Sequence, residues 1–250
     1  MVSIHQADIT NGLLTLLSAA DFSRLAPDLE AIELPRNFVF CNAGEAPDHY
    51  YFLETGVGSI VAISPVAGQR VEVGLFGRDG MTPTTAAQDA GSHLHAIFMQ
   101  IAGRGLRIRM AALAAPLAAS TPMRVLFDRY GQTLATQTAF TALSNAVHQV
   151  EVRLVRWILM CHDRTAGESI DLTHEFLSTM LAVRRSSVTT ALHELEGKHL
   201  IVSTRGLIVV RDRQALEALA SDAYGAPERE YRRLIGPLGK GAEANGTAAG

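Results

Sequence analysis

Cysteine is scarce in this sequence of 250 residues, which contains only Cys41 and Cys161. The two form no CxxC pair, and no group of cysteines and histidines has the spacing of a zinc site. We therefore expect no disulfide framework, no structural zinc and no other metal or cofactor site. So few cysteines are typical of a protein in the reducing cytosol, so we predict a cytoplasmic protein.

Long apolar runs and targeting signals are also lacking. The first residues carry no positively charged region of the kind that opens a secretory signal. The longest apolar run, Met110 to Ala119, is too short to cross a bilayer and contains Pro116. We expect no membrane-spanning segment and no membrane partner.

Catalytic motifs are missing as well. The sequence has no nucleophile elbow, no HExxH, no P-loop and no paired carboxylates in a plausible cleft. His148, Cys161 and His162 fall on one helical stretch, but nothing in the pattern orients them as a catalytic triad. The sequence therefore predicts a protein that is not an enzyme.

A strong charge of one sign is the last absence, since the formal net charge is only -3. Residues 1–145 contain 9 Lys and Arg against 12 Asp and Glu, whereas residues 146–213 contain 9 against 8. That slight excess is far from the strongly basic composition of many nucleic-acid-binding domains. A nucleic-acid function must therefore rest on where the basic residues lie.

The pattern of apolar residues divides the chain into regions. Residues 12–34 have helical spacing broken at Pro27, which indicates one or two short helices. Short strand-like runs separated by glycines follow from 38 to 109, and these predict an antiparallel sandwich or roll in a domain over 1–115. The runs are FVFC, YYFL, SIVAIS, VEVGLF, HAIFMQI and GLRIRM.

A long helical stretch begins near Met123 and has almost no helix breakers until residue 164. Because it is longer than most helices of globular proteins, it should either kink or pack against a copy of itself. We interpret 116–145 as a dimerisation helix, with Leu126 and Leu134 at the contact. The alternative is a single long helix on the surface of its own domain. The Gly- and Ala-rich end, 236–250, is expected to be a disordered tail.

Two closely spaced helical patterns lie within the region 146–235. The first covers Thr173 to Leu181 with Thr173 as N-cap, and the second runs from Arg185 to Gly197. Residues 199–210 then show two short β-branched runs around Thr204-Arg205-Gly206, the pattern of a hairpin. Helix, tight turn, helix and hairpin in this order predict a winged helix-turn-helix, whose second helix enters the major groove of DNA.

The second helix has two chemically different faces. Val188, Leu192 and Leu195 form an apolar face, so arginines and hydroxyls point outward. Arg185 could make a bidentate contact to guanine, while short hydroxyls contact bases or phosphates. The alternative is an ordinary solvated helix face. The predicted DNA contacts are Thr173, Arg184, Arg185, Ser186, Ser187, Thr189, Thr190, His193, Lys198 and Arg205.

The stretch LTHEFLSTMLAVRRSSVTTALHELEGKHLIVSTRGLIVVRD resembles the C-terminal DNA-binding domain of the Crp/Fnr transcription regulators. CNAGEAPDHYYFLETGVGSIVAI and VEVGLFGRDGM resemble parts of that family's cyclic-nucleotide-binding β-roll, so the likeness spans about residues 12–235. It implies an α+β fold: an N-terminal antiparallel β-roll of the jelly-roll type, a long dimerisation helix and a C-terminal winged helix-turn-helix. It also implies a homodimer on a palindromic site in double-stranded DNA, and RNA polymerase as a partner if the protein activates transcription. The family's base-reading positions fall on Arg185, Ser186 and Thr190.

The resemblance fails at the nucleotide site. Family members that bind cyclic nucleotides use a Gly-Glu pair for the ribose and an Arg-Ser or Arg-Thr pair for the phosphate, but here Gly77 precedes Arg78 and Asp79. His93 stands near the expected arginine, and a buried phosphate without its arginine lacks the ion pair that offsets its desolvation. We expect an effector that is unknown or absent. The alternatives are a nucleotide bound through Arg78, Asp79, His93 or His95, and a sensor whose helix-turn-helix contacts proteins.

Overall fold

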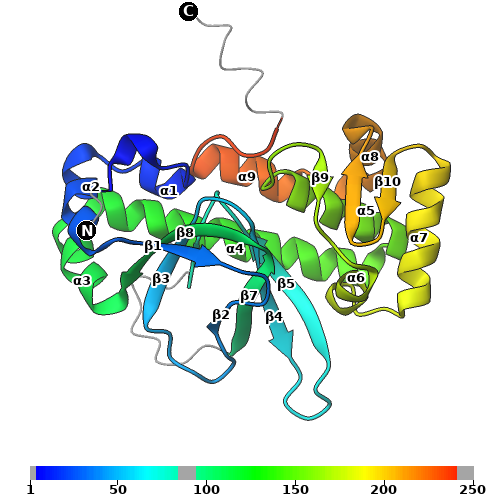
Figure 1. Ribbon diagram of the computed structural model, residues 1–250, viewed down its shortest axis with the longest axis horizontal. Coiled ribbons are helices and arrows are strands. Elements are labelled where there is room, and N and C mark those ends of the chain that lie inside the picture. The colour runs from blue at the N-terminus through cyan, green and yellow to red at the C-terminus, as the bar shows by residue number, and fades with distance from the viewer. Residues whose placement is uncertain (1–3, 84–93, 241–250) are drawn as a thin grey trace, which may run out of the picture.

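The computed structural model describes residues 4–83 and 94–240, with a β-roll at one end and a helical domain at the other (Figure 1). The described chain starts with the short helices η1 (Gln6–Asp8), α1 (Gly12–Thr15), α2 (Ala19–Leu25) and η2 (Ala26–Asp28). Asn11 and Ser18 cap α1 and α2 by accepting hydrogen bonds from backbone N–H groups. The short helices expected after residue 12 are therefore confirmed as far as Asp28.

Two antiparallel sheets form the β-roll, in the orders β1-β8-β3-β6 and β2-β7-β4-β5. Aromatic and aliphatic side chains between them, among them Phe40, Tyr51, Phe76 and Met99, make the core of the roll. The expected antiparallel roll is thus confirmed. The strands are β1 (Glu30–Leu34), β2 (Val39–Cys41), β3 (His49–Leu53), β4 (Val57–Ile63), β5 (Arg70–Phe76), β6 (Met81–Thr82), β7 (His95–Ile101) and β8 (Gly103–Arg109).

The six strand-like runs of the sequence all correspond to strands, but β1 and β6 were not expected. Residues 30–34 were included in a helical region, and this part of the prediction is wrong. Glu30 pairs with Arg107 on β8 through an ion pair of 2.8 Å, and Ile32 packs on the core of the roll. Pairing with a distant strand overrides the weak helical spacing of this segment.

The long helical stretch does kink. Helix α3 (Met110–Ala119) precedes α4 (Thr121–Val147), which starts at the N-cap Ser120 instead of residue 116. His148 has an extended backbone conformation, and α5 (Val150–His162) begins after it. No single helix among the described residues meets the length and hydropathy of a membrane span; α3 and α4 do so only as a pair bent by 118°.

One side of α4 is buried against its own chain. Phe127, Tyr130, Leu134 and Gln137 lie on this side, and Leu134 belongs to the core of the roll with 9% of its surface exposed. Leu126 packs on the neighbouring N-terminal cluster. Leu134 is therefore buried within the single chain and is not available for a dimer contact, whereas the assignment of the half-buried Leu126 to that contact stays a prediction.

The C-terminal domain has the predicted order of elements. Helices α6 (His174–Met180) and α7 (Arg185–Gly197) are followed by the hairpin of β10 (Ile201–Thr204) and β11 (Leu207–Val210). Strand β9 (Ser169–Ile170) pairs with β11 and completes a small sheet. After the wing come α8 (Arg213–Ala220), η3 (Ser221–Ala223) and α9 (Ala226–Leu234).

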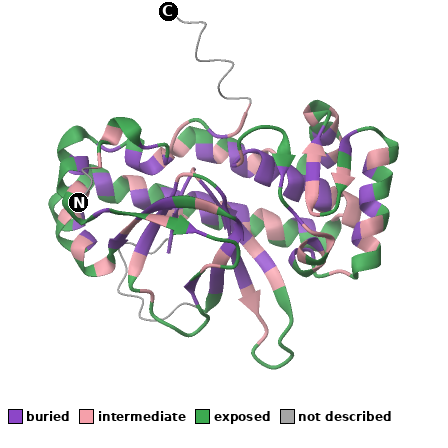
Figure 2. Cartoon of the chain, in the orientation of Figure 1, coloured by how far each residue is buried: buried purple, intermediate pink, exposed green. Residues whose placement is uncertain are grey.

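The β-roll and the DNA-binding domain share one hydrophobic core. Val57, Val61 and Leu75 from the outer face of one sheet pack in the same cluster as Trp157 and Leu177 from α5 and α6. Figure 2 shows buried residues continuing from this sheet into the helical domain. Because the interface is largely apolar, the two domains pack as one unit in this structure.

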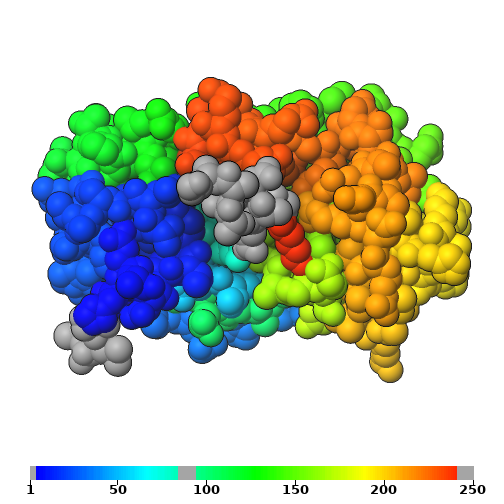
Figure 3. Space-filling model, turned by 90° about the horizontal axis from the view of Figure 1, so that it is seen from above, coloured from blue at the N-terminus to red at the C-terminus, as the bar shows by residue number. Residues whose placement is uncertain are grey.

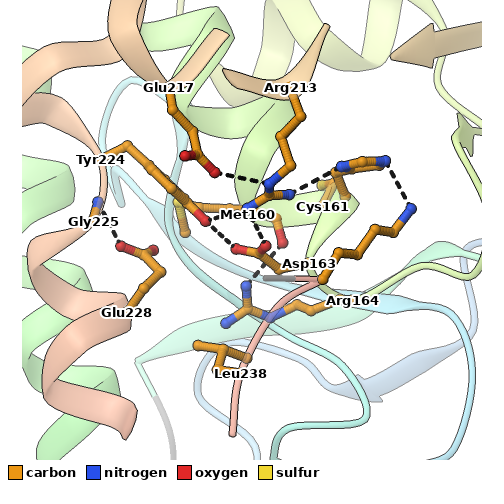
Figure 4. A network of polar contacts seen from close by, with 12 residues as sticks. Met160, Cys161, Asp163, Arg164, Arg213, Glu217, Tyr224, Gly225, Glu228 and Leu238 are labelled. Carbon is orange, nitrogen blue, oxygen red and sulfur yellow. Dashed lines mark hydrogen bonds and ion pairs between the residues drawn. The ribbon is translucent and has the colours of Figure 1, made fainter. Parts of the chain in front are cut away.

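The end of the described chain also connects the two domains. Helix α9 lies along α4, and Figure 3 shows it in orange-red beside the green helices and the yellow-orange DNA-binding domain. Leu238 is buried in the N-terminal cluster, so residues 236–240 are not the start of a disordered tail as expected. Asp163 anchors this region by accepting hydrogen bonds from Arg213 at 2.7 Å and Tyr224 at 2.6 Å (Figure 4).

Candidate nucleic-acid interface

The turn between α6 and α7 sets the position of the second helix. Thr173 caps α6, since its hydroxyl accepts a hydrogen bond from the N–H of Phe176 at 3.2 Å. Ala182 adopts a left-handed conformation with φ 50°, which reverses the chain within a few residues. The guanidinium of Arg153 on α5 donates to the carbonyl of Leu181 and holds this turn against the domain. The two helices are thus fixed with a tight turn between them.

The bounds of α7, Arg185–Gly197, are those predicted from the sequence. Val188, Leu192 and Leu195 are each fully buried, together with Ala191, so one side of the helix anchors it in the domain core. Figure 1 places α7 at the edge of the molecule farthest from the roll, and Figure 2 shows exposed residues along it. The helix therefore presents a complete face to the outside.

The outward face of α7 and the tip of the hairpin carry arginines whose side chains are exposed to solvent. Arg184, Arg185 and Arg205 are exposed, and within residues 4–83 and 94–240 they form no side-chain hydrogen bond or ion pair. Arg184 is the N-cap residue, but its side chain makes no capping hydrogen bond. Ser186, Thr190 and His193 are exposed on the same helix. These guanidinium and hydroxyl groups are free to bind an external acceptor.

The remaining predicted contacts already have partners or are half-buried. The Thr189 hydroxyl donates to the carbonyl of Arg185 at 3.1 Å and lies 3.3 Å from Nδ1 of His174. The ammonium of Lys198 donates to Glu151 at 2.6 Å. Thr173 is engaged as an N-cap, and Ser187 is half-buried. These side chains would need to exchange an internal contact for an external one.

The wing presents one arginine at its tip. Thr204 pairs with Leu207, so Arg205 and Gly206 form the two-residue connection between β10 and β11. Gly206 has φ 82°, a conformation that favours glycine. The hairpin expected around these residues is confirmed, and it brings Arg205 to the surface.

Of the residues expected at an effector site, Arg78 and Asp79 line one cavity together with Gly12 and Tyr231, whereas His95 does not line it. Asp79 is buried and forms a bidentate ion pair with Arg164, at 2.9 and 2.7 Å. Arg78 is half-buried and its carbonyl accepts from the N–H of Gly12, while His95 is exposed at the start of β7. His93 lies outside the described residues. Within the described residues, no group of three or more His, Cys, Asp or Glu side chains could hold a metal ion.

Sequence reasoning missed the residues that join the two domains. Arg164 and Asp79 are 85 positions apart, as are Trp157 and Glu72, whose side chains are hydrogen-bonded at 3.0 Å. The long helical stretch up to residue 164 predicted a helix here but did not reveal the polar groups on the opposite sheet. Only an alignment of related sequences, through paired changes, could have signalled these contacts in advance.

Helices α6 and α7, the tight turn between them and the hairpin that follows have the arrangement of a winged helix-turn-helix, a fold that binds DNA. Residues 152–219 match the family model of the Crp-like helix-turn-helix domain. The chain thus has a Crp-like helix-turn-helix domain, and its fold is that of Crp/Fnr transcription regulators. The resemblance and the fold class predicted from the sequence are both confirmed.

Solved structures show the same fold over most of the chain. A putative Crp/Fnr-family regulator from Eubacterium rectale is 15% identical, with a TM-score of 0.64 and coverage of 84% of this chain and 98% of that one. FixK2 from Bradyrhizobium japonicum is 15% identical, with a TM-score of 0.67 and coverage of 78% and 99%. A CRP-family regulator from Thermus thermophilus is 18% identical, with a TM-score of 0.63 and coverage of 78% and 99%. Comparison with curated protein sequences gave no match.

Proposed function

We propose that the protein is a sequence-specific transcription regulator that binds a palindromic operator in double-stranded DNA as a homodimer. The observation that carries this proposal is the face of α7, where Arg184 and Arg185 are exposed and unpaired among the described residues, with Arg205 similarly free on the wing. A helix anchored by a buried apolar side and followed by a wing has the geometry that enters a major groove.

The side chains divide into base-reading and backbone-binding groups. Arg185 lies in the first turn of α7, the part of a recognition helix that meets base edges, and its guanidinium fits O6 and N7 of guanine. Ser186 and Thr190 are exposed beside it and offer short hydroxyls. Arg184 and Arg205 flank this patch and would bind phosphates, which fix the register of the protein on DNA.

The outer side of α4 supports the homodimer. Val125 and Leu143 are 38% and 47% exposed, although both are large and apolar. Between and beyond them runs a line of exposed alanines with the four-three-four spacing of a heptad seam, which allows two helices to approach closely. The alanines are Ala135, Ala139, Ala142 and Ala146. A copy of the same helix is the natural partner for this line, because a twofold axis pairs identical surfaces.

An effector is either absent or binds elsewhere than the family's nucleotide site. The carboxylate of Asp79 is held by Arg164, and both side chains are at most 5% exposed. A nucleotide bound through Arg78 and the histidines near β7 is the second candidate for the roll. Contact with RNA polymerase applies if the protein activates transcription.

Selection of DNA from a random pool tests the proposed function directly. We expect the full-length protein to enrich an inverted repeat whose half-sites lie one helical turn, about 10 base pairs, apart. Arg185→Ala, with the α4 surface unchanged, is the matched control and should no longer enrich one guanine position in each half-site. A wild-type pool that stays random would contradict sequence-specific binding.

A further inference from the structure

The interface between the β-roll and α5 contains a buried carboxyl group. Glu72 on β5 is only 4% exposed and lies in the largely apolar contact between the sheet and the DNA-binding domain. The indole N–H of Trp157 donates to its Oε1 at 3.0 Å, and the hydroxyl oxygen of Ser59 lies 3.1 Å from its Oε2. Within the described residues, no arginine, lysine or histidine forms an ion pair with Glu72.

The hydroxyl group of Ser59 has one proton and lies between two acceptors, Glu72 and Gln100. Ser59 Oγ lies 2.7 Å from Oε1 of Gln100, so its single proton can serve either Gln100 or Glu72 but not both. If Glu72 carries a proton, it donates to Ser59, and Ser59 donates onward to Gln100. With the Gln100 amide oriented so that its oxygen faces Ser59, a protonated Glu72 completes one directed chain of hydrogen bonds, whereas an ionised Glu72 leaves two acceptors for one donor.

The charged groups around Glu72 do not replace the missing counter-ion. Arg156 faces it from α5 but is itself buried and donates to the carbonyl of Gln137 at 3.5 Å. Arg164 is committed to Asp79. The thiol of Cys161 also faces this cluster, and burial raises the pKa of that thiol well above its usual value, so it stays neutral. Desolvation therefore dominates and raises the pKa of Glu72 to about 8.

We propose that the protonation state of Glu72 controls the packing of the β-roll against the DNA-binding domain. The carboxyl group is neutral while the domains are packed, and its ionisation weakens their contact. Trp157 and Ser59 come from opposite sides of the interface, so the protonated carboxyl joins the two domains at its centre. A buried, unpaired carboxylate is costly, and separation of the domains would give it water instead.

The direction of the pH dependence follows from the raised pKa. The packed interface binds the proton more tightly than a solvent-exposed glutamate, whose pKa is 4.5. Packing is therefore strongest at low pH and loses its advantage as the pH rises through about 8. Between pH 4.5 and about pH 8, the equilibrium constant for separation of the two domains should increase about tenfold for each pH unit.

Trp157 is the only tryptophan in the chain and reports on this contact directly. We would measure acrylamide quenching of its fluorescence in the full-length protein without DNA, from about pH 6 to about pH 9. The wild type should show a rise in quenching as the pH increases. Glu72→Gln keeps a neutral donor to Ser59 and should remove that rise, whereas Glu33→Gln on the exposed part of β1 should retain it. A wild type without the transition, or Glu72→Gln with an unchanged one, would overturn the proposal.

A second variant tests the proposed role of Glu72 even if Glu72→Gln does not fold. Ser59→Ala removes the group that accepts the acid proton, so the midpoint should shift to lower pH. A shift to higher pH would mean that Ser59 donates to an ionised Glu72, and control of domain packing by protonation of Glu72 would then be refuted. Because DNA is absent, failure of this test leaves the proposed operator binding untouched.

Discussion

Asp79 and Arg164 form a buried ion pair that holds the β-roll against the DNA-binding domain. Their side chains are 5% and 3% exposed, and Asp79 also accepts from the N–H of Gly77 at 2.8 Å. Substituting Asp79→Asn should lower the free energy of unfolding by about 3–5 kcal/mol, because Arg164 then keeps a buried charge without its partner. Urea unfolding of the full-length protein measures this difference.

A surface pair provides the control for this prediction. Arg233 and Glu230 lie 2.7 Å apart on α9, where solvent screens their attraction. Glu230→Gln should leave the unfolding curve unchanged. Replacing both Asp79 and Arg164 by apolar residues should recover part of the lost stability, and equal losses in Asp79→Asn and the double variant would contradict our description of the pair.

Arg205 tests the proposed contact of the wing with phosphates. Arg205→Ala should weaken binding equally on all DNA duplexes, since a phosphate contact carries no sequence information. The slope of log affinity against log salt should flatten by about 0.9 for each subunit, the counterion release of one phosphate. Titrations at several salt concentrations measure both effects. A loss of affinity confined to the selected operator would assign Arg205 to base reading instead.

At the residue scale, the sequence predicted the position of a side chain well where the spacing of apolar residues within one helix determines which way that side chain faces. The outward set on α7 and the capping role of Thr173 follow from helical periodicity and turn chemistry, and the structure contains both. The partners of Asp79 and Glu72 depend on how two distant segments meet, which no local pattern encodes. Leu134 shows the same limit, because an apolar residue on a helix does not reveal which surface will cover it.

Helix α4 is the element on which the proposed dimer depends. Ala139 lies near the middle of its exposed alanine line, so Ala139→Asp would place two carboxylates opposite each other across a twofold axis. We expect the wild type to sediment near twice its monomer mass of 26.9 kDa and the variant to sediment as a monomer. Analytical ultracentrifugation at micromolar concentration provides the measurement.

Ala114→Asp is the matched control for the dimer, since Ala114 is an exposed alanine on α3 and not on α4. It should leave the sedimentation unchanged. A monomeric wild type, or equal effects of both substitutions, would remove α4 as the interface.

Elements with strong alternation or strong helical spacing were predicted well. The six strand-like runs and α7 are present, because each has a buried face that its own sequence makes apolar. Strand β1 was not predicted, since its five residues form a strand only through pairing with β8. The break between α4 and α5 lies at His148, close to the boundary between 145 and 146 that the sequence suggested, although no proline or glycine marks it.

At the scale of the whole molecule, the lack of the family's nucleotide-binding motifs around Gly77 predicts that cyclic nucleotides do not control this protein. Cyclic AMP or cyclic GMP at about 1 mM should leave the melting temperature and the DNA affinity unchanged, since a ligand that binds only the folded state must raise its stability. Thermal unfolding with and without each nucleotide tests this. A clear increase that disappears in Arg78→Ala would show that the roll has rebuilt a phosphate site.

The most direct test of the account is the binding of Arg185→Ala to the selected operator and to single-mismatch duplexes. The substitution should cost about 1–3 kcal/mol on the operator and relax the preference for one guanine in each half-site, because a bidentate base contact is lost. An equal loss on every duplex would make Arg185 a phosphate contact and move base reading to Ser186 or Thr190. Unchanged affinity on all duplexes would contradict the central claim that α7 reads DNA.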